Sequence, residues 1–163
     1  MSFKKVKAEG KAQFSETPGY PSDARIKKGM VALIECEQEI PCNPCETSCP
    51  QNAIKIGIPI TNIPELDGDA CVGCGLCIAG CPGLAIFMVD MTFSETTALA
   101  VIPYEYLPQL EKDDRVTVKN RDGEPIGTGV IHKAVYNTKT DKTTVLYIEV
   151  DKSIAEEVRA VGQ

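Results

Sequence analysis

The segments CEQEIPCNPCETSCP, residues 36–50, and CVGCGLCIAGCP, residues 71–82, contain all eight cysteines of the 163-residue chain. The second segment reads C-x2-C-x2-C-x3-C-P. The first reads C-x5-C-x2-C-x3-C-P, so three extra residues separate its first two cysteines. A shift of 32 residues places the last three cysteines and the proline of the first segment on those of the second, and CPQNAI then matches CPGLAI. Because similarity at a fixed offset marks duplicated units, we predict two equivalent halves.

The spacing of these cysteines suits a polynuclear metal centre. Thiolates are soft ligands, and iron–sulfur clusters are among the sites that they select. Three closely spaced cysteines on one loop can hold three corners of a cubane, and the fourth corner requires a cysteine from elsewhere. Gly73 and Gly75 have no Cβ atom, so the backbone there can approach such a centre closely. Backbone N–H groups that face the centre would stabilise its negative charge.

Two other uses of eight cysteines stay open. Pairs of the C-x2-C type also occur in four-cysteine zinc sites, so a zinc-binding interaction module is one alternative. Disulfide bonds in a secreted domain are another. However, the first residues, MSFKKVKAEG, are charged where a signal peptide has an apolar core. Each run can supply the fourth cysteine that the other run needs, and this favours iron–sulfur clusters over both alternatives.

The two segments resemble the cluster-binding runs of two-[4Fe–4S] bacterial ferredoxins, in which the fourth cysteine of each run ligates the other cluster. This resemblance spans residues 30–92 and implies an α+β, ferredoxin-like fold with two [4Fe–4S] clusters. The three-residue insertion lies within residues 37–41. The implied ligands of the first cluster are Cys36, Cys42, Cys45 and Cys81, and those of the second are Cys71, Cys74, Cys77 and Cys49.

A wider resemblance includes the flanking segments. The stretch ALIECEQEIPCNPCETSCPQNAI, with a basic segment before it and a β-rich segment after it, is similar to iron–sulfur subunits of FAD-dependent amine or imino-acid dehydrogenases, such as those for proline or hydroxyproline. It implies a hetero-oligomer in which a flavoprotein subunit oxidises the substrate and this chain carries the electrons away. A free-standing ferredoxin shuttle is the alternative.

Composition and charge limit the classes of function. The chain is 43% hydrophobic with a formal net charge of -6, which is uneven: +4 over residues 1–29, -7 over 30–92 and -3 over 93–163. The acidic total argues against nucleic-acid binding, and an acidic face can steer a basic partner. No apolar run approaches the roughly 20 residues that a membrane span requires. We expect a cytoplasmic protein, because that compartment keeps cysteine ligands reduced.

Three segments follow from these patterns. Residues 1–29 form an N-terminal arm, either a flexible tail or an arm that wraps a partner subunit. The aromatic residues Phe3, Phe14 and Tyr20 favour the second interpretation. Residues 30–92 form the cluster unit. Residues 93–163, without cysteine, form a small β domain with a C-terminal helix.

Within the cluster unit, apolar runs predict strands over residues 30–34 and 84–89. The alternation in IKIGIPI predicts a third strand over 54–60, with its four isoleucines on one face. A short helical turn is expected directly after Cys49 and Pro50.

In the last segment, strands are predicted over residues 97–102, 115–120, 126–136 and 143–150. They form a mostly antiparallel unit, either a barrel or a curled sheet. Asp122-Gly123 marks a hairpin turn. A capping box from Ser153 to Glu156 predicts the final helix.

Candidate catalytic residues are few. His132, the single histidine, lies in a strand pattern, where a surface or half-buried position is the simplest interpretation, and Asp113-Asp114 resembles a solvated turn. The sequence shows neither a phosphate-binding loop nor a Ser/His/Asp arrangement nor a dinucleotide fingerprint. We therefore expect the chain to have no active site of its own.

Overall fold

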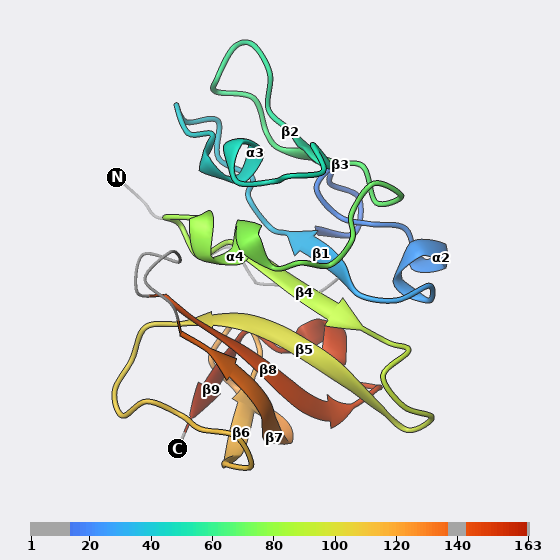
Figure 1. The fold of residues 1–163 in the computed structure, drawn as a ribbon, viewed down its shortest axis with the longest axis vertical. Coiled ribbons are helices and arrows are strands. Elements are labelled where there is room, and N and C mark those ends of the chain that lie inside the picture. Colours follow the sequence, from blue (N-terminus) through green and yellow to red (C-terminus); the bar gives the residue numbers. More distant parts are fainter. Residues whose placement is uncertain (1–13, 137–142, 163) are drawn as a thin grey trace.

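A computed structural model describes residues 14–136 and 143–162 of the chain (Figure 1). It contains a seven-stranded sheet in the order β1-β4-β5-β8-β7-β6-β9 and a two-stranded sheet, β2-β3. All neighbouring strands run antiparallel. The strands are β1 (Val31–Ile34), β2 (Ile54–Lys55), β3 (Glu65–Leu66), β4 (Ile86–Asp90), β5 (Thr97–Tyr104), β6 (Arg115–Lys119), β7 (Pro125–Val135), β8 (Thr144–Asp151) and β9 (Ala160–Gly162). The helices are α2 (Asp23–Ile26), α3 (Pro44–Thr47), α4 (Leu76–Gly80) and the 3-10 helix η2 (Ala155–Glu157).

The sequence repeat is also a structural repeat. β1 pairs with β4, and β2 pairs with β3, so the first strand of each half pairs with the last strand of the other half. The pair Ile34–Ile86 in one sheet corresponds, at the offset of 32, to the pair Leu66–Ile54 in the other. α3 and α4 start at equivalent positions and pack against each other. The prediction of two equivalent halves is therefore confirmed.

The contact between the two helices depends on a glycine. A Cβ atom on Gly80 would lie 2.9 Å from Ser48 Oγ and 3.2 Å from Ser48 Cβ. Ser48 and Gly80 are equivalent positions of the repeat, so the two halves meet where one of them has no side chain. This close approach positions the cysteines that both helices carry.

The strands β1 and β4 are buried on both faces, which explains why their sequences are continuous apolar runs instead of alternating patterns. Val31 and Leu33 of β1 pack into one core, whereas Ala32 and Ile34 pack into a second core with the cysteine loops. The alternate residues of β4 divide between the two cores in the same way. One sheet therefore supports both the β-rich part and the cysteine loops.

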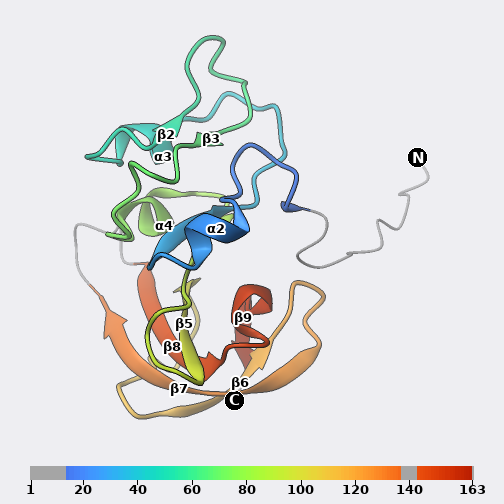
Figure 2. The same ribbon diagram turned by 90° about the vertical axis from the view of Figure 1, so that its right-hand side faces the viewer.

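The C-terminal strands extend this same sheet. β5 pairs with β4, and β8, β7, β6 and β9 follow in order, so the expected β unit is continuous with the cluster unit. Figure 2 shows that the strands curl into an open sheet, with η2 inside the curve and the cysteine loops at the opposite end of the molecule. The curled sheet was one of the two predicted forms, and the other, a barrel, is not what the structure shows.

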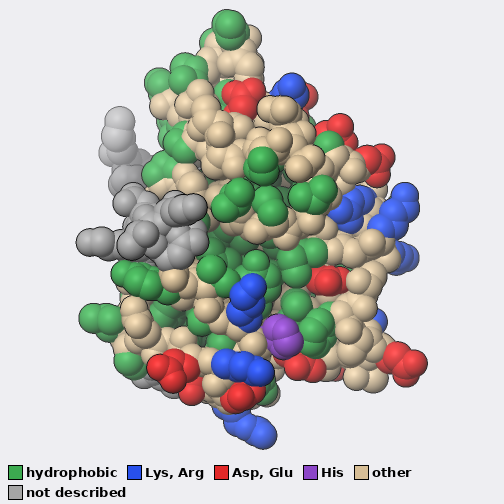
Figure 3. Space-filling view, viewed as in Figure 1, with side chains coloured by type: hydrophobic (Ala, Val, Ile, Leu, Met, Phe, Trp, Pro, Cys, Tyr) green, Lys and Arg blue, Asp and Glu red, His purple; other side chains and the backbone are tan. Residues whose placement is uncertain are grey.

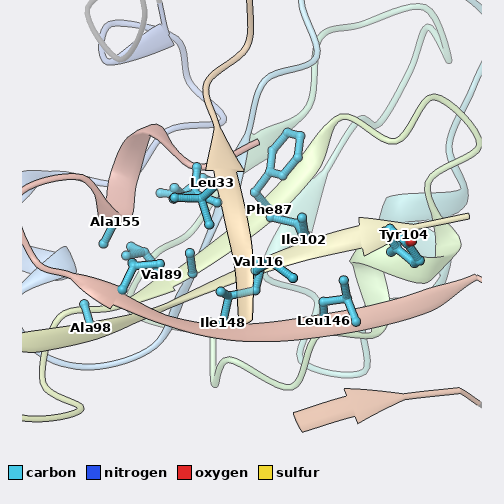
Figure 4. Close-up of a cluster of buried hydrophobic side chains, with 14 of the residues drawn as sticks. Leu33, Phe87, Val89, Ala98, Ile102, Tyr104, Val116, Leu146, Ile148 and Ala155 are labelled. Carbon is cyan, nitrogen blue, oxygen red and sulfur yellow. The ribbon is translucent and has the colours of Figure 1, made fainter. Parts of the chain in front are cut away.

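The larger core fills the inside of this curve (Figure 4). Side chains from β4, β5, β6 and β8 meet there, and Ala155 of η2 packs against them. Phe14, Tyr20 and Ile26 belong to the same core, and the side chain of Phe14 is 0% exposed. The expectation that Phe14 and Tyr20 of the N-terminal arm contact a partner subunit is therefore wrong, because they fill this chain's own core. Phe3 lies outside the described residues.

Three predicted elements are also wrong. Residues 50–53, directly after Cys49 and Pro50, form no helical turn, and the helix of each half lies before its Cys-Pro, at α3 and α4. The strand expected over residues 54–60 ends at Lys55, and of its four isoleucines only Ile54 and Ile56 are buried. Gly57, with φ of 66°, turns the backbone out of the sheet.

The expected C-terminal helix is instead one turn of 3-10 helix, η2, followed by the strand β9. Ser153 bonds Asp151 instead of capping a helix. Val161 pairs with Val118 of β6, because the open edge of that strand offers backbone partners that suit a β-branched residue.

In the described part of the chain, none of the helices is long and apolar enough to cross a membrane. His132 lies exposed on β7, with the ring of Phe93 edge-on at 5.1 Å between centroids. The strands predicted over residues 97–102, 115–120, 126–136 and 143–150 correspond to β5, β6, β7 and β8, with ends that differ by two residues at most.

Candidate metal centres

The structure brings the eight cysteines together in two sets of four, each around its own cavity. Each set takes three cysteines from one run and one cysteine from the other, as the crossed pattern of the sequence predicts. All eight are free thiols. The first cavity is lined by Cys36, Cys42, Cys45 and Cys81, and the second by Cys49, Cys71, Cys74 and Cys77.

Equivalent cysteines of the two runs sit in equivalent local structures. Cys45 on α3 and Cys77 on α4 are both buried. Cys49 and Cys81, which cross to the other half, each accept a hydrogen bond at Sγ from a backbone N–H four residues later. These bonds measure 3.3 Å from Ala53 N and 3.4 Å from Ala85 N.

A left-handed residue makes each of these bonds possible. Asn52 and Leu84 both have φ of 51°, which turns the following N–H back toward the preceding sulfur. Such a conformation is uncommon for a non-glycine residue and rare for leucine. Its occurrence at both equivalent positions indicates that the sharp turn after each Cys-Pro is part of the site's construction.

The two glycines of the second run line the second cavity and also pack closely against the rest of the protein. Gly73 and Gly75 have φ of 70° and 80°, which is unfavourable for other residues. A Cβ atom on Gly73 would lie 2.8 Å from Met30 Cβ, and one on Gly75 would lie 3.2 Å from Tyr147 Oη. These glycines therefore let the loop pack against its own protein scaffold.

The thiols of each set are close enough to influence one another's ionisation. The pKa of Cys77 is raised to about 12, first by burial and then by the nearby Cys71, Cys74 and Cys49. Burial likewise raises the pKa of Cys45 to about 11, with Cys81 as its next largest cause. Four thiolates around one cavity repel one another, and iron would supply the positive charge that offsets this repulsion. The donor set, four soft sulfur atoms around each cavity, fits an iron–sulfur cluster.

The first cavity lies beneath a projecting loop. Ile34, Ile56 and Ile86 line it together with Ile40 of the inserted segment. The loop over residues 57–64 closes its outer side, with Cys42 N donating to Ile60 O at 3.4 Å. The sequence places acidic residues around this region: Glu37 and Glu39 are exposed, and Glu46 accepts a bond from Gly57 N at 3.4 Å.

A buried ion pair ties the first cysteine run to the C-terminal strands. Glu35, directly before Cys36, has a side chain that is 2% exposed. Its Oε1 accepts hydrogen bonds of 2.9 Å and 2.6 Å from Arg159, and its Oε2 contacts Arg121. Arg121 lies over the ring of Phe14, and Arg159 over that of Phe87. Sequence reasoning missed this group, because the three charges are far apart along the chain.

The second cavity is covered by residues from outside the cysteine runs. Ala32 of β1 and Met88 of β4 form one wall. Tyr147 of β8 lies close by: burial raises its pKa, and the neighbouring Cys74 and Cys77 raise it further. Arg25 of α2 donates a 2.8 Å hydrogen bond to the carbonyl oxygen of Cys71. Neither Tyr147 nor Arg25 belongs to a motif, and only the three-dimensional structure places them here.

Comparison with known proteins concerns the cysteine-rich part of the chain. Residues 40–85 match the family described as a 4Fe-4S dicluster domain. This match begins after Cys36, so the displaced first cysteine lies outside it. No solved structure matches the chain.

Three curated relatives are each similar to a part of the chain. A ferredoxin-type protein NapF from Haemophilus influenzae is 41% identical over 58 residues, which is 34% of this chain and 33% of the relative. One of the subunits of an ion-translocating oxidoreductase complex from Methanosarcina acetivorans is 40% identical over 36% of this chain and 22% of its own length. An uncharacterized ferredoxin from Methanocaldococcus jannaschii is 40% identical over 46% of this chain and 47% of its own length.

The chain thus spans less than half the length of each of these relatives. Together, the family match and the relatives support a bacterial-type ferredoxin segment that carries 4Fe-4S clusters.

Proposed function

We propose that this chain is an electron-transfer protein that holds two [4Fe–4S] clusters, one in each cysteine-lined cavity. The observation that carries the proposal is the division of eight thiols into two crossed sets of four. Each cluster, when bound, supplies one-electron oxidation and reduction. Cys36, Cys42, Cys45 and Cys81 would hold the first cluster, and Cys71, Cys74, Cys77 and Cys49 would hold the second.

The remaining residues of the two cavities orient the sulfur ligands and exclude water. The N–H groups of Ala53 and Ala85 bond the sulfur atoms of Cys49 and Cys81. Hydrogen bonds to ligand sulfur and shielding from solvent both influence a cluster's reduction potential. Buried isoleucines around the first cavity, and Ala32 and Met88 at the second, provide that shielding.

The partner that we propose is the flavoprotein subunit of a dehydrogenase that oxidises an amine, amino acid or imino acid. Support comes from the resemblance of residues 32–54 to the iron–sulfur subunits of such enzymes. The name of one relative, which belongs to an oxidoreductase complex, also fits a role within a multi-subunit assembly.

The loop over the first cavity is the docking surface that we propose. It projects between β2 and β3 at the top of Figure 1 and carries apolar side chains at its tip in Figure 3. Ile58 is 97% exposed, and Ile40 and Ile60 are 47% and 44% exposed. Asn62 holds the loop in place by donating to Ile56 O at 2.9 Å. The nearby Glu37, Glu39 and Glu46 suit a partner with basic residues around an apolar recess.

A free-standing ferredoxin shuttle is the second candidate, and one observation favours it. The flanking residues Phe14 and Tyr20 and the C-terminal strands share a core with β1 and β4. The flanking segments therefore have a structural role without any partner, so their presence alone is no argument for a complex.

Two measurements test the proposal. Anaerobically purified protein is expected to contain about eight iron and eight sulfide per chain. Two zinc ions without sulfide would instead establish the zinc-binding module. Purification of the tagged full-length chain from its native host is expected to bring down a flavoprotein that reduces it when substrate is added. Two clusters in a chain that co-purifies with no flavoprotein would favour the shuttle.

A further inference from the structure

Arg25 holds the loop that leads into the second cysteine run. Ser22 caps the N-terminus of its helix, α2, and Ser22 Oγ accepts a bond from Arg25 N at 3.2 Å. The guanidinium then donates four hydrogen bonds, all to backbone carbonyl oxygens. They run to Gly68 at 2.6 Å, Gly29 at 3.1 Å, Met30 at 3.1 Å and Cys71 at 2.8 Å.

These contacts join three parts of the chain at the second cavity. Gly29 and Met30 lead into β1, Gly68 belongs to the loop after β3, and Cys71 is the first thiol of the second set. The single atom Nη2 bonds both Met30 O and Cys71 O. The stem of Arg25 packs on Gly68, where an added Cβ would lie 3.1 Å from Arg25 Cγ. The guanidinium therefore has a fixed place next to a proposed cluster ligand.

The positive charge of Arg25 has different surroundings from the charges of Arg121 and Arg159, the two arginines near the first run. Arg121 and Arg159 share the carboxylate of Glu35, so their charges are partly neutralised. The four acceptors of Arg25 are neutral carbonyls. Two exposed aspartates flank its partner Gly68 in sequence, Asp67 and Asp69, and the carboxylate of Asp67 accepts bonds from Asp69 N and Ala70 N.

We infer that Arg25 is a positioning residue that also raises the reduction potential of the centre held by Cys71, Cys74, Cys77 and Cys49. Reduction adds negative charge, and a fixed positive charge nearby stabilises the reduced state. Nearby charge is one of the factors that set a cluster's potential. The inference rests on the proposed function, since it requires that centre to be present.

The effect should be confined to one centre. The offset of 32 residues that relates the two halves places Gly57 at the position of Arg25, so the first run has no equivalent arginine. Residue 25 also lies outside the segment that matches the dicluster family. A segment outside the ferredoxin unit would thus change the reduction potential of one of two otherwise similar centres.

Potentiometric titration of the full chain, followed by electron paramagnetic resonance, tests this inference. In Arg25→Gln, the ratio of oxidised to reduced second centre at a fixed potential is expected to rise at least tenfold, a shift of about 59 mV for one electron. The first centre should keep its potential. Arg25→Lys keeps the charge but has no planar fork, so its second centre should stay closer to the native potential. Lys27→Gln, which removes an exposed cation of the same segment, is the control.

Each other outcome has a meaning. A native potential in Arg25→Gln, or an equal fall in Arg25→Gln and Arg25→Lys, overturns the role of the charge. An equal shift in Lys27→Gln overturns the specific role of Arg25. If Arg25→Gln loses the second centre, Arg25→Lys is the deciding variant. A second centre that Arg25→Lys retains near the native potential supports the inference. Loss of the second centre in Arg25→Lys as well overturns the role of the charge and leaves only the role of the hydrogen bonds that hold the loop. A wild-type chain without two iron–sulfur centres contradicts the proposed function instead.

Discussion

The two cysteine-lined cavities share one construction but have different surroundings. The repeat gives both the same buried helical cysteine, the same left-handed turn and the same N–H bond to a crossing sulfur. Around the first cavity, an inserted segment and a projecting loop expose isoleucines and carboxylates to solvent. Around the second, Arg25 and Tyr147 reach in from the flanking segments.

This difference separates what the repeat supplies to both cavities from what other segments supply to only one of them. Residues that hold the ligands lie within the repeat, so both cavities have them. Residues that set accessibility or local charge come from segments that the repeat does not include. We therefore expect substitutions within the repeat to act on assembly, and substitutions outside it to act on one centre or on the partner.

The largest expected effect concerns Cys36, the thiol that the insertion displaces. Cys36→Ala should remove one iron or the whole first centre, up to about half of the iron. The second centre should be unaffected, because its cavity takes no thiol from this part of the run. Iron and sulfide analysis measures the effect. An iron content equal to that of the wild type would mean that Cys36 is not a ligand.

The ion pair at the first run predicts a large loss of stability. Arg159→Met leaves the buried carboxylate of Glu35 with Arg121 alone and should cost about 3–5 kcal/mol. Thermal unfolding of the loaded protein, followed by circular dichroism, measures it. Arg115→Met, which changes an exposed arginine of β6, is the matched control. An equal loss in both variants would show that the pair has no special role.

The helix contact predicts a smaller effect, and one that both halves share. In Gly80→Ala, the new Cβ atom would collide with Ser48, so α3 and α4 must move apart at a cost of about 1–3 kcal/mol. Gly83→Ala, where the nearest atom is 4.0 Å from the added Cβ, should be tolerated better. If the spectra of only one centre change in Gly80→Ala, the helices do not couple the two halves as described.

The smallest effect on stability is expected at the exposed loop. Ile58→Ser should change stability by less than about 0.5 kcal/mol, because its side chain already faces solvent. Binding to the flavoprotein should weaken nevertheless. Leu107→Ser, at a side chain 85% exposed elsewhere on the surface, is the control. Unchanged binding of Ile58→Ser would exclude this loop as the docking surface.

The repeat made the central part of the molecule predictable from sequence. Residues 49–54 and 81–86 share a pattern, and the structure gives both segments the same turn and the same bond to sulfur. The runs at 30–34 and 84–89 were recognisable as strands because burial on both faces makes them continuously apolar. Four strands of the C-terminal part followed from alternation and turn residues.

The failures have two physical causes: a local turn inside an alternating segment, and contacts with residues far away in the sequence. The alternation in residues 54–60 indicates a strand, but Gly57 turns the chain outward. The end of the chain has a helical spacing, yet the open edge of β6 draws it into β9. Arg25 and Glu35 could not be identified at all, because their partners lie far away in the sequence.

The central claim is that the two runs exchange their fourth cysteines, and single-cysteine variants test it most directly. Titration of each variant, with electron paramagnetic resonance as the readout, shows which centre remains and at what potential. Cys49→Ala and Cys77→Ala should lose the same centre, and Cys81→Ala and Cys45→Ala should lose the other one. If Cys49→Ala instead loses the centre that Cys45→Ala loses, each run holds its own cluster and the crossed arrangement is wrong.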